Sequence, residues 1–168
     1  MVIEQVTSKN FDKSLGELLK TKKADNIVKG RFDLESIELT KKSNFIIDFL
    51  SSIKSIESLT YKILFWEKDS AIENLIKFNS SKDDSFKITL SYKNDQPSGV
   101  AFLESKKVDN HFLKVLLDNH FNYEMAVDPS LNLRVQICIN QKNIITIMDI
   151  YDDRGLDIYY IPQLSSCR

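Results

Sequence analysis

Four aspartates near the C-terminal end are the residues whose type and spacing could do chemistry. Asp149, Asp152, Asp153 and Asp157 fall within nine residues. Carboxylates gathered at a β-turn are ligands that suit Mg²⁺ or Ca²⁺, although this spacing does not follow the EF-hand pattern. The cluster therefore leaves two interpretations open: a small metal-dependent hydrolase, or side chains that build a turn.

The segment Asp152–Gly155 is equally typical of turn chemistry. Aspartate side chains accept hydrogen bonds from nearby backbone N–H groups, and glycine supplies the positive φ that many tight turns require. We therefore expect Arg154 and Gly155 to shape a turn, with Gly155 in a left-handed conformation. Turn chemistry alone does not explain why Asp153 and Asp157 join Asp149, because like charges at close quarters repel.

Other catalytic arrangements find little support. His111 and His120 lie nine positions apart in one predicted helix, and at roughly 100° per residue they point to nearly opposite sides. Each is expected to be a surface histidine. The sequence contains neither a phosphate-binding loop nor the zinc-protease or serine-hydrolase motifs, and it has only four glycines. We expect no enzyme activity, no bound metal and no cofactor.

Composition excludes further classes of function. The 23 basic residues nearly balance the 24 acidic ones, which argues against direct binding of nucleic acid. No apolar run approaches the roughly 20 residues of a membrane span, and the first residues do not resemble a signal peptide. Cys138 and Cys167 fit neither a metal site nor a redox pair. We expect free thiols and a cytoplasmic location.

The balanced total conceals an acidic stretch between Glu124 and Asp157. It holds three basic residues against six acidic ones: Glu124, Asp128, Asp149, Asp152, Asp153 and Asp157. An acidic surface favours association with a basic partner.

Apolar spacing predicts the elements that must position these residues. Helices are expected at 10–20, at Ser43–Ile56 with Ser43 or Asn44 as its cap, at 69–79 and at Val108–Phe121. Strands are expected at Arg31–Thr40, Leu59–Glu67, Phe86–Tyr92 and Val100–Ser105, followed by a β-meander of Leu131–Asn140, Ile144–Tyr151 and Leu156–Ile161. This order predicts an α+β fold, with a largely antiparallel sheet that ends in the meander and helices packed on one face. We expect one domain over 1–168, with 1–40 as a peripheral region.

The predicted closing hairpin is similar to one in a family of bacterial proteins. The resemblance rests on the run Ile150-Tyr151-Asp152-Asp153-Arg154-Gly155-Leu156-Asp157-Ile158, with support from Asp128-Pro129 and from the strand Leu131–Gln136. Proteins of that family often appear as immunity proteins of contact-dependent growth inhibition and other polymorphic toxin systems. The resemblance implies a protein that binds and blocks a cognate toxin domain inside the producing cell.

The leading hypothesis is thus a stoichiometric toxin inhibitor, and most toxins of this kind are nucleases with basic grooves. Aromatic and acidic side chains would complement such a groove. The candidate partner-binding residues are Tyr151, Asp152, Asp153, Asp157, Tyr159, Glu124 and Asp128. A competing interpretation is that the motif only shapes the hairpin and that the two tyrosines cover the sheet. The alternative functions are the metal-dependent hydrolase and a housekeeping interaction module or homodimer.

Overall fold

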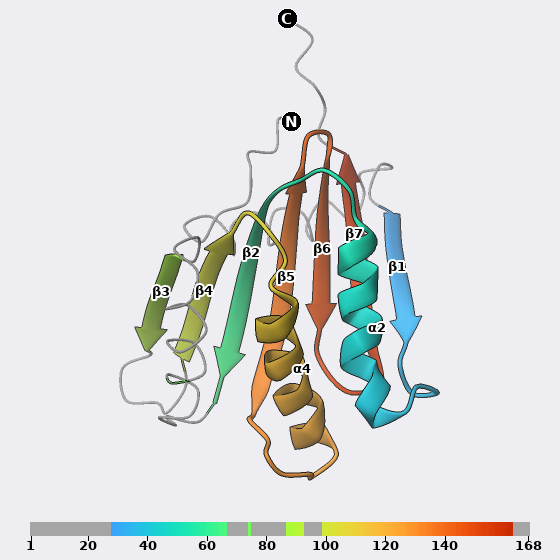
Figure 1. The fold of residues 1–168 in the computed structure, drawn as a ribbon, viewed down its shortest axis with the longest axis vertical. Coiled ribbons are helices and arrows are strands. Elements are labelled where there is room, and N and C mark those ends of the chain that lie inside the picture. The colour runs from blue at the N-terminus through green and yellow to red at the C-terminus, as the bar shows by residue number, and fades with distance from the viewer. Residues whose placement is uncertain (1–27, 67–73, 75–86, 93–98, 163–168) are drawn as a thin grey trace, which may run out of the picture.

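The computed structural model describes residues 28–66, 74, 87–92 and 99–162 (Figure 1). The helix predicted at 10–20 lies outside these residues, as does nearly all of the one predicted at 69–79. The described part contains one sheet of seven strands and two helices that pack against it.

Every neighbouring pair of strands in the sheet is antiparallel. The strands lie in the order β1-β7-β6-β5-β2-β4-β3. Their bounds are β1 Val28–Asp33, β2 Ile56–Phe65, β3 Lys87–Tyr92, β4 Gly99–Ser105, β5 Leu133–Gln141, β6 Ile144–Ile150 and β7 Gly155–Pro162. The last three form the expected meander, so that the predicted fold class is confirmed.

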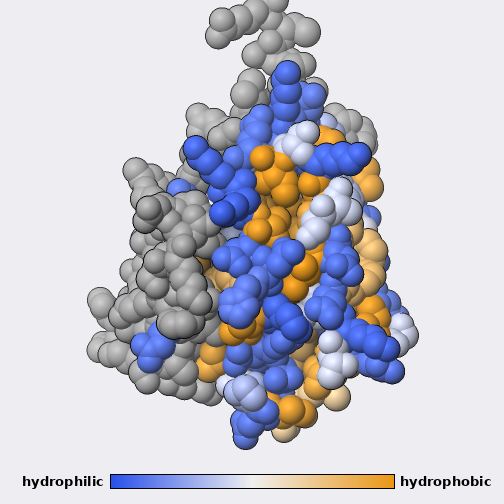
Figure 2. All heavy atoms as spheres, viewed as in Figure 1, coloured by the Kyte–Doolittle hydropathy of each residue, from blue (hydrophilic) through white to orange (hydrophobic). Residues whose placement is uncertain are grey.

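Both helices, α2 (Leu39–Ser52) and α4 (Asn110–Glu124), cover the same face of the sheet. Figure 1 shows α4 in front of β5, with α2 beside it nearer the β1 edge. Polar atoms coat the outward sides of the helices, and apolar atoms fill the strip between them (Figure 2). Of the helices in the described ranges, none is both long and apolar enough to cross a membrane.

Helix α2 begins one turn earlier than predicted. Its first residue is Leu39, which packs against the core and extends the apolar stripe of Ile46 and Leu50 backwards. Ser43, expected as a cap, is instead buried inside the helix. The helix ends at Ser52 because Ile53 adopts an extended conformation, so the predicted end at Ile56 was also wrong. At α4 the Asp109 side chain caps the helix by accepting a hydrogen bond from the Phe112 N–H (2.9 Å).

The main core lies between the helices and the sheet. Tyr61, Phe112 and Phe121 are the largest fully buried side chains there, and the Tyr61 and Phe112 rings meet edge to face. Alternate residues of the meander point to the other face, where a second buried cluster holds Cys138, Ile145, Ile147 and Ile161. Cys138 is a free cysteine, and burial raises the pKa of its thiol well above the ordinary range. Cys167 lies outside the described residues.

Candidate functional site: the acidic C-terminal hairpin

The acidic hairpin, residues 149–159, consists of the end of β6, a turn and the start of β7. Asp152 organises the turn. Its Oδ1 accepts hydrogen bonds from the backbone N–H groups of Arg154 (2.9 Å) and Gly155 (3.2 Å). Its Oδ2 accepts from the Arg154 guanidinium at 3.1 and 2.7 Å. Burial alone would raise the pKa of Asp152, but the bonds from Arg154 and Gly155 outweigh it and lower that pKa.

Asp153 points towards the helices instead of following Asp152. Its Oδ2 lies 3.2 Å from the Nζ of Lys42, and the same ammonium donates to the Asp153 carbonyl oxygen. Lys42 belongs to α2 and is 4% exposed. A charge this deeply buried needs a partner, because leaving it unpaired in a poorly solvated place is costly. The pair therefore ties the turn to α2.

Asp149 and Asp157 face each other on the side of the sheet away from the helices. They occupy directly opposite positions of β6 and β7. Each has a cation from the next strand outward: Arg134 of β5 donates two hydrogen bonds to Asp149 (3.1 and 2.7 Å), and Lys29 of β1 lies 2.8 Å from Asp157. These contacts raise the pKa of both cations. They explain how two aspartates can stand side by side despite their repulsion.

Gly155 does not have the positive φ that the sequence predicted, and no described glycine does. The glycine is needed for a different reason. A Cβ at this position would lie 2.8 Å from the Phe32 carbonyl oxygen of β1, closer than carbon and oxygen normally approach. The neighbouring Arg154 carbonyl accepts a hydrogen bond from the Leu34 N–H (2.7 Å). Strand β1 therefore packs closely against the turn of the hairpin.

The two tyrosines of the hairpin lie half-buried beneath basic side chains of β1. The Lys29 Nζ sits 5.4 Å from the centre of the Tyr159 ring, and the Arg31 guanidinium sits 5.9 Å from that of Tyr151. Cations at this distance from an aromatic face are attracted to it. Tyr159 also donates a long hydrogen bond to Asp157 (3.4 Å). Both rings therefore make contacts within the protein itself.

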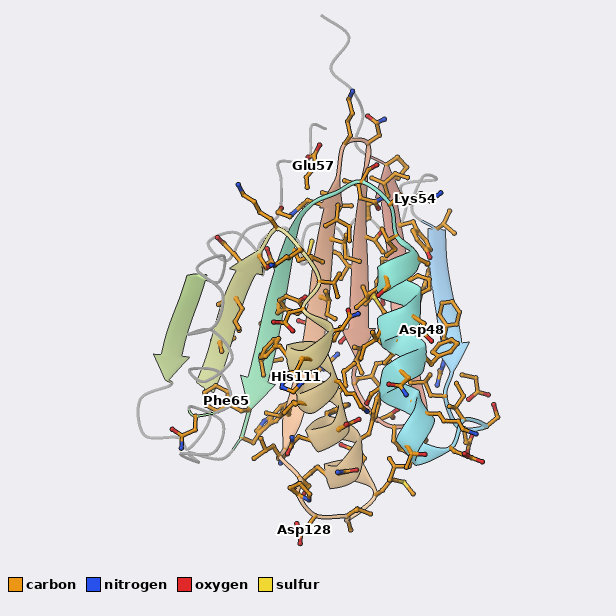
Figure 3. All side chains as sticks on the ribbon, viewed as in Figure 1. Asp48, Lys54, Glu57, Phe65, His111 and Asp128 are labelled. Carbon is orange, nitrogen blue, oxygen red and sulfur yellow. The ribbon has the colours of Figure 1, made fainter. Side chains whose placement is uncertain are left out.

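The remaining two candidates, Glu124 and Asp128, lie at the lower end of α4. Glu124 is the last residue of the helix, and Asp128 lies on the loop that follows it (Figure 3). Both are exposed. Burial of part of the side chain raises the pKa of Glu124, and repulsion from Asp153 and Asp152 adds to the effect. Glu124 is thus electrostatically close to the turn.

The acids do not converge on one point. Asp149 and Asp157 face away from the helices, while Asp153 binds a residue of α2. Across residues 28–66, 74, 87–92 and 99–162, no three His, Cys, Asp or Glu side chains are grouped so as to hold a metal ion.

The burial of one of the two histidines differs from its prediction. His111 is exposed, as expected (Figure 3), but His120 is fully buried. Its Nδ1 lies 2.7 Å from the Leu133 carbonyl oxygen, which can only accept, so Nδ1 carries the proton. Its Nε2 is buried and has no hydrogen-bond partner among the described residues. Burial is the largest influence on the pKa of His120 and lowers it.

The sequence did not single out Lys42, and it placed His120 wrongly at the surface, although a signal existed for each. Lys42 precedes Ile46 by four positions, and His120 follows Leu116 by four, so both lie on the apolar stripes of their helices. A polar residue on such a stripe is a candidate for a specific buried partner.

No protein-family model, no curated protein and no solved structure matches the chain.

Proposed function

We propose that the chain is an immunity protein, which binds a cognate toxin domain and neutralises it by equimolar association. The expected toxin is a nuclease domain of a large secreted effector. The proposal starts from the similarity of the closing hairpin to those of immunity proteins in polymorphic toxin systems, and it gives the chain a protein partner and no reaction of its own.

The observation that carries the proposal is the use of the hairpin's carboxylates within the fold. Each has a cation of its own: Arg134 for Asp149, Arg154 for Asp152, Lys42 for Asp153 and Lys29 for Asp157. A motif used in this way fixes a scaffold. That fits a family whose members share a hairpin and face different toxins, because contacts with the toxin must change from one member to the next.

The alternative of a metal-dependent hydrolase gains nothing from this geometry. A metal ion between Asp149 and Asp157 would have to displace the cations of both residues. Asp153 points to the other side of the sheet and could not join them. Calorimetric titration with Mg²⁺, Mn²⁺ and Ca²⁺ tests the alternative directly. Tight binding of any of them would revive it.

The proposed function predicts that a large secreted protein is encoded next to this chain, and the C-terminal domain of that protein is the probe that tests it. That domain is expressed in cells with and without this chain, and both are purified together. We expect the chain to restore growth and to elute with the domain as an equimolar complex. A toxin domain of unrelated sequence serves as the control and should remain toxic. Continued toxicity and separate elution of the cognate pair would contradict the proposal.

A further inference from the structure

The end of α4 and the loop that follows it expose several large apolar side chains. Tyr123, Met125 and Val127 are 39%, 50% and 43% exposed. Trp66, at the end of β2, is 46% exposed and bonds through its backbone N–H to the Asn132 carbonyl (3.4 Å). Single exposed apolar residues are ordinary, but a group of them marks an interaction site.

This loop is held in one conformation by its own hydrogen bonds. Asn122 donates from its side chain to the Pro129 carbonyl (2.9 Å), and Asn132 donates to the Tyr123 hydroxyl (3.0 Å). Ala126 has a φ of 54°, a left-handed conformation that residues with a Cβ rarely adopt. Four backbone N–H groups also bond back towards α4, namely those of Met125, Ala126, Val127 and Leu131. The apolar side chains are therefore presented by a rigid support, which reduces the entropy lost on binding.

The charges around the loop indicate what kind of partner fits. Glu124 and Asp128 are exposed on either side of Met125 and Val127. Within the part of the chain that the structure describes, neither carboxylate has an ion-pair partner, unlike the four aspartates of the hairpin. Their negative charge repels phosphate, so nucleic acids and anionic membranes are poor partners. A protein surface with lysines or arginines is the complementary one.

We propose that this docking loop, residues 122–130, is the surface that receives the partner, and that the partner offers an apolar patch rimmed by basic side chains. Tyr, Trp and Met are among the residue types enriched in the centres of protein interfaces. The inference rests on the proposed function, and it places the contact with the toxin domain on this loop and not on the hairpin.

The test uses the toxin domain of the preceding experiment as the probe. Met125→Ser combined with Val127→Ser should weaken binding by about tenfold or more, because it removes the apolar centre. The matched control is Ile144→Ser, since Ile144 is 40% exposed at the opposite end of the sheet. That variant should bind within about twofold of the unmodified chain. Dissociation constants come from calorimetry, beside a thermal melt of each variant.

The acidic rim has its own test. Glu124→Gln combined with Asp128→Asn should slow association several-fold at low ionic strength and make it less sensitive to salt. Asp48→Asn is the control, because Asp48 is an exposed acid on the outer side of α2 (Figure 3). It should leave the association rate nearly unchanged.

A third measurement needs no variant. Hydrogen exchange of the unmodified chain should slow at 122–130 when the toxin domain binds. Binding without protection there, or undiminished binding by the serine pair, would overturn the docking loop while the proposed function stands. Failure of the unmodified chain to bind the toxin domain would overturn both. Sedimentation is compared between the unmodified chain and the serine pair. Self-association that the serine pair abolishes would identify a second copy as the occupant and would overturn the proposal of a different protein as partner.

Discussion

Lys42 of α2 and Asp153 of the hairpin turn, 111 residues apart in the chain, form an ion pair with an Nζ–Oδ2 distance of 3.2 Å. The lysine side chain is 5% exposed and the aspartate 21%. The pair connects the first described helix to the turn before the last described strand. Its contribution to stability is therefore a direct measure of how firmly the hairpin is anchored.

We expect Asp153→Asn to lower the free energy of unfolding by about 1–3 kcal/mol, because it leaves the buried ammonium with a weaker partner. Urea denaturation measures the change. Lys41→Met is the matched control: Lys41 pairs with Glu38 at 2.7 Å, but both side chains are more than two-thirds exposed, so its loss should stay within about 0.5 kcal/mol. Equal midpoints for the two variants would show that the buried pair is dispensable.

Arg134→Met should destabilise the sheet by about 1 kcal/mol, since Asp149 would then face Asp157 without a cation. Adding Asp149→Asn to that variant removes the repulsion and should recover part of the loss. A double-mutant cycle in urea gives the coupling between the two residues. A coupling indistinguishable from zero would mean that solvent alone screens the two carboxylates.

Gly155→Ala should lower the free energy of unfolding, measured by urea denaturation, by about 1–3 kcal/mol, because the added Cβ would clash with the Phe32 carbonyl oxygen. Gly30→Ala on β1 is the control: a Cβ there meets nothing within 4 Å. We expect that change to be neutral or slightly stabilising. Gly155→Asn distinguishes the steric cause from a left-handed backbone, which asparagine tolerates. If asparagine were clearly better than alanine at this position, the steric explanation would fail.

The stability of the protein should fall in mild acid through His120. Its pKa is lowered in the folded state, so below about pH 6.5 the unfolded chain binds a proton that the native protein does not. Stability from this group is present above that pH and decreases by up to about 1.4 kcal/mol per pH unit as the pH falls towards the folded pKa.

The measurement compares urea midpoints at about pH 7.5 and about pH 5.5 for the unmodified chain, His120→Gln and His111→Gln. Carboxylates also titrate in this range and affect all three proteins equally. Only the difference between the proteins in how far the urea midpoint changes with pH is therefore informative. The His120→Gln variant should lose less stability between the two values than the other proteins. An equal loss of stability in all three proteins would show that groups other than His120 cause the acid sensitivity.

The alternation of apolar residues was sufficient to predict the meander and the fold class. Val135, Ile137 and Ile139 point to the helices while Gln136 and Cys138 point away, and this period of two needs only local information. The pairings of the site could not be predicted in this way. Lys42 with Asp153, and Lys29 with Asp157, join distant parts of the chain, and such partners are fixed by the order of strands in the sheet.

The role of Gly155 also depends on a distant part of the chain, and local sequence could not predict it. A glycine beside two aspartates is typical of a turn with a positive φ, and that local interpretation was wrong. The actual requirement comes from Phe32, which belongs to a strand at the other end of the described chain. His120 was likewise misjudged because its hydrogen-bond acceptor, the Leu133 carbonyl oxygen, lies beyond the helix.

The pairing of β1 with β7 has a consequence for how the protein is made. Val28 lies opposite Tyr160 and Asp33 opposite Gly155, so the first described strand has the last described strand as its neighbour. During synthesis β1 cannot form this pairing until β7 has been translated. A chain interrupted before β7 would therefore leave β1 without its neighbour in the sheet. The ion pair of Lys29 with Asp157 likewise forms only once β7 is in place.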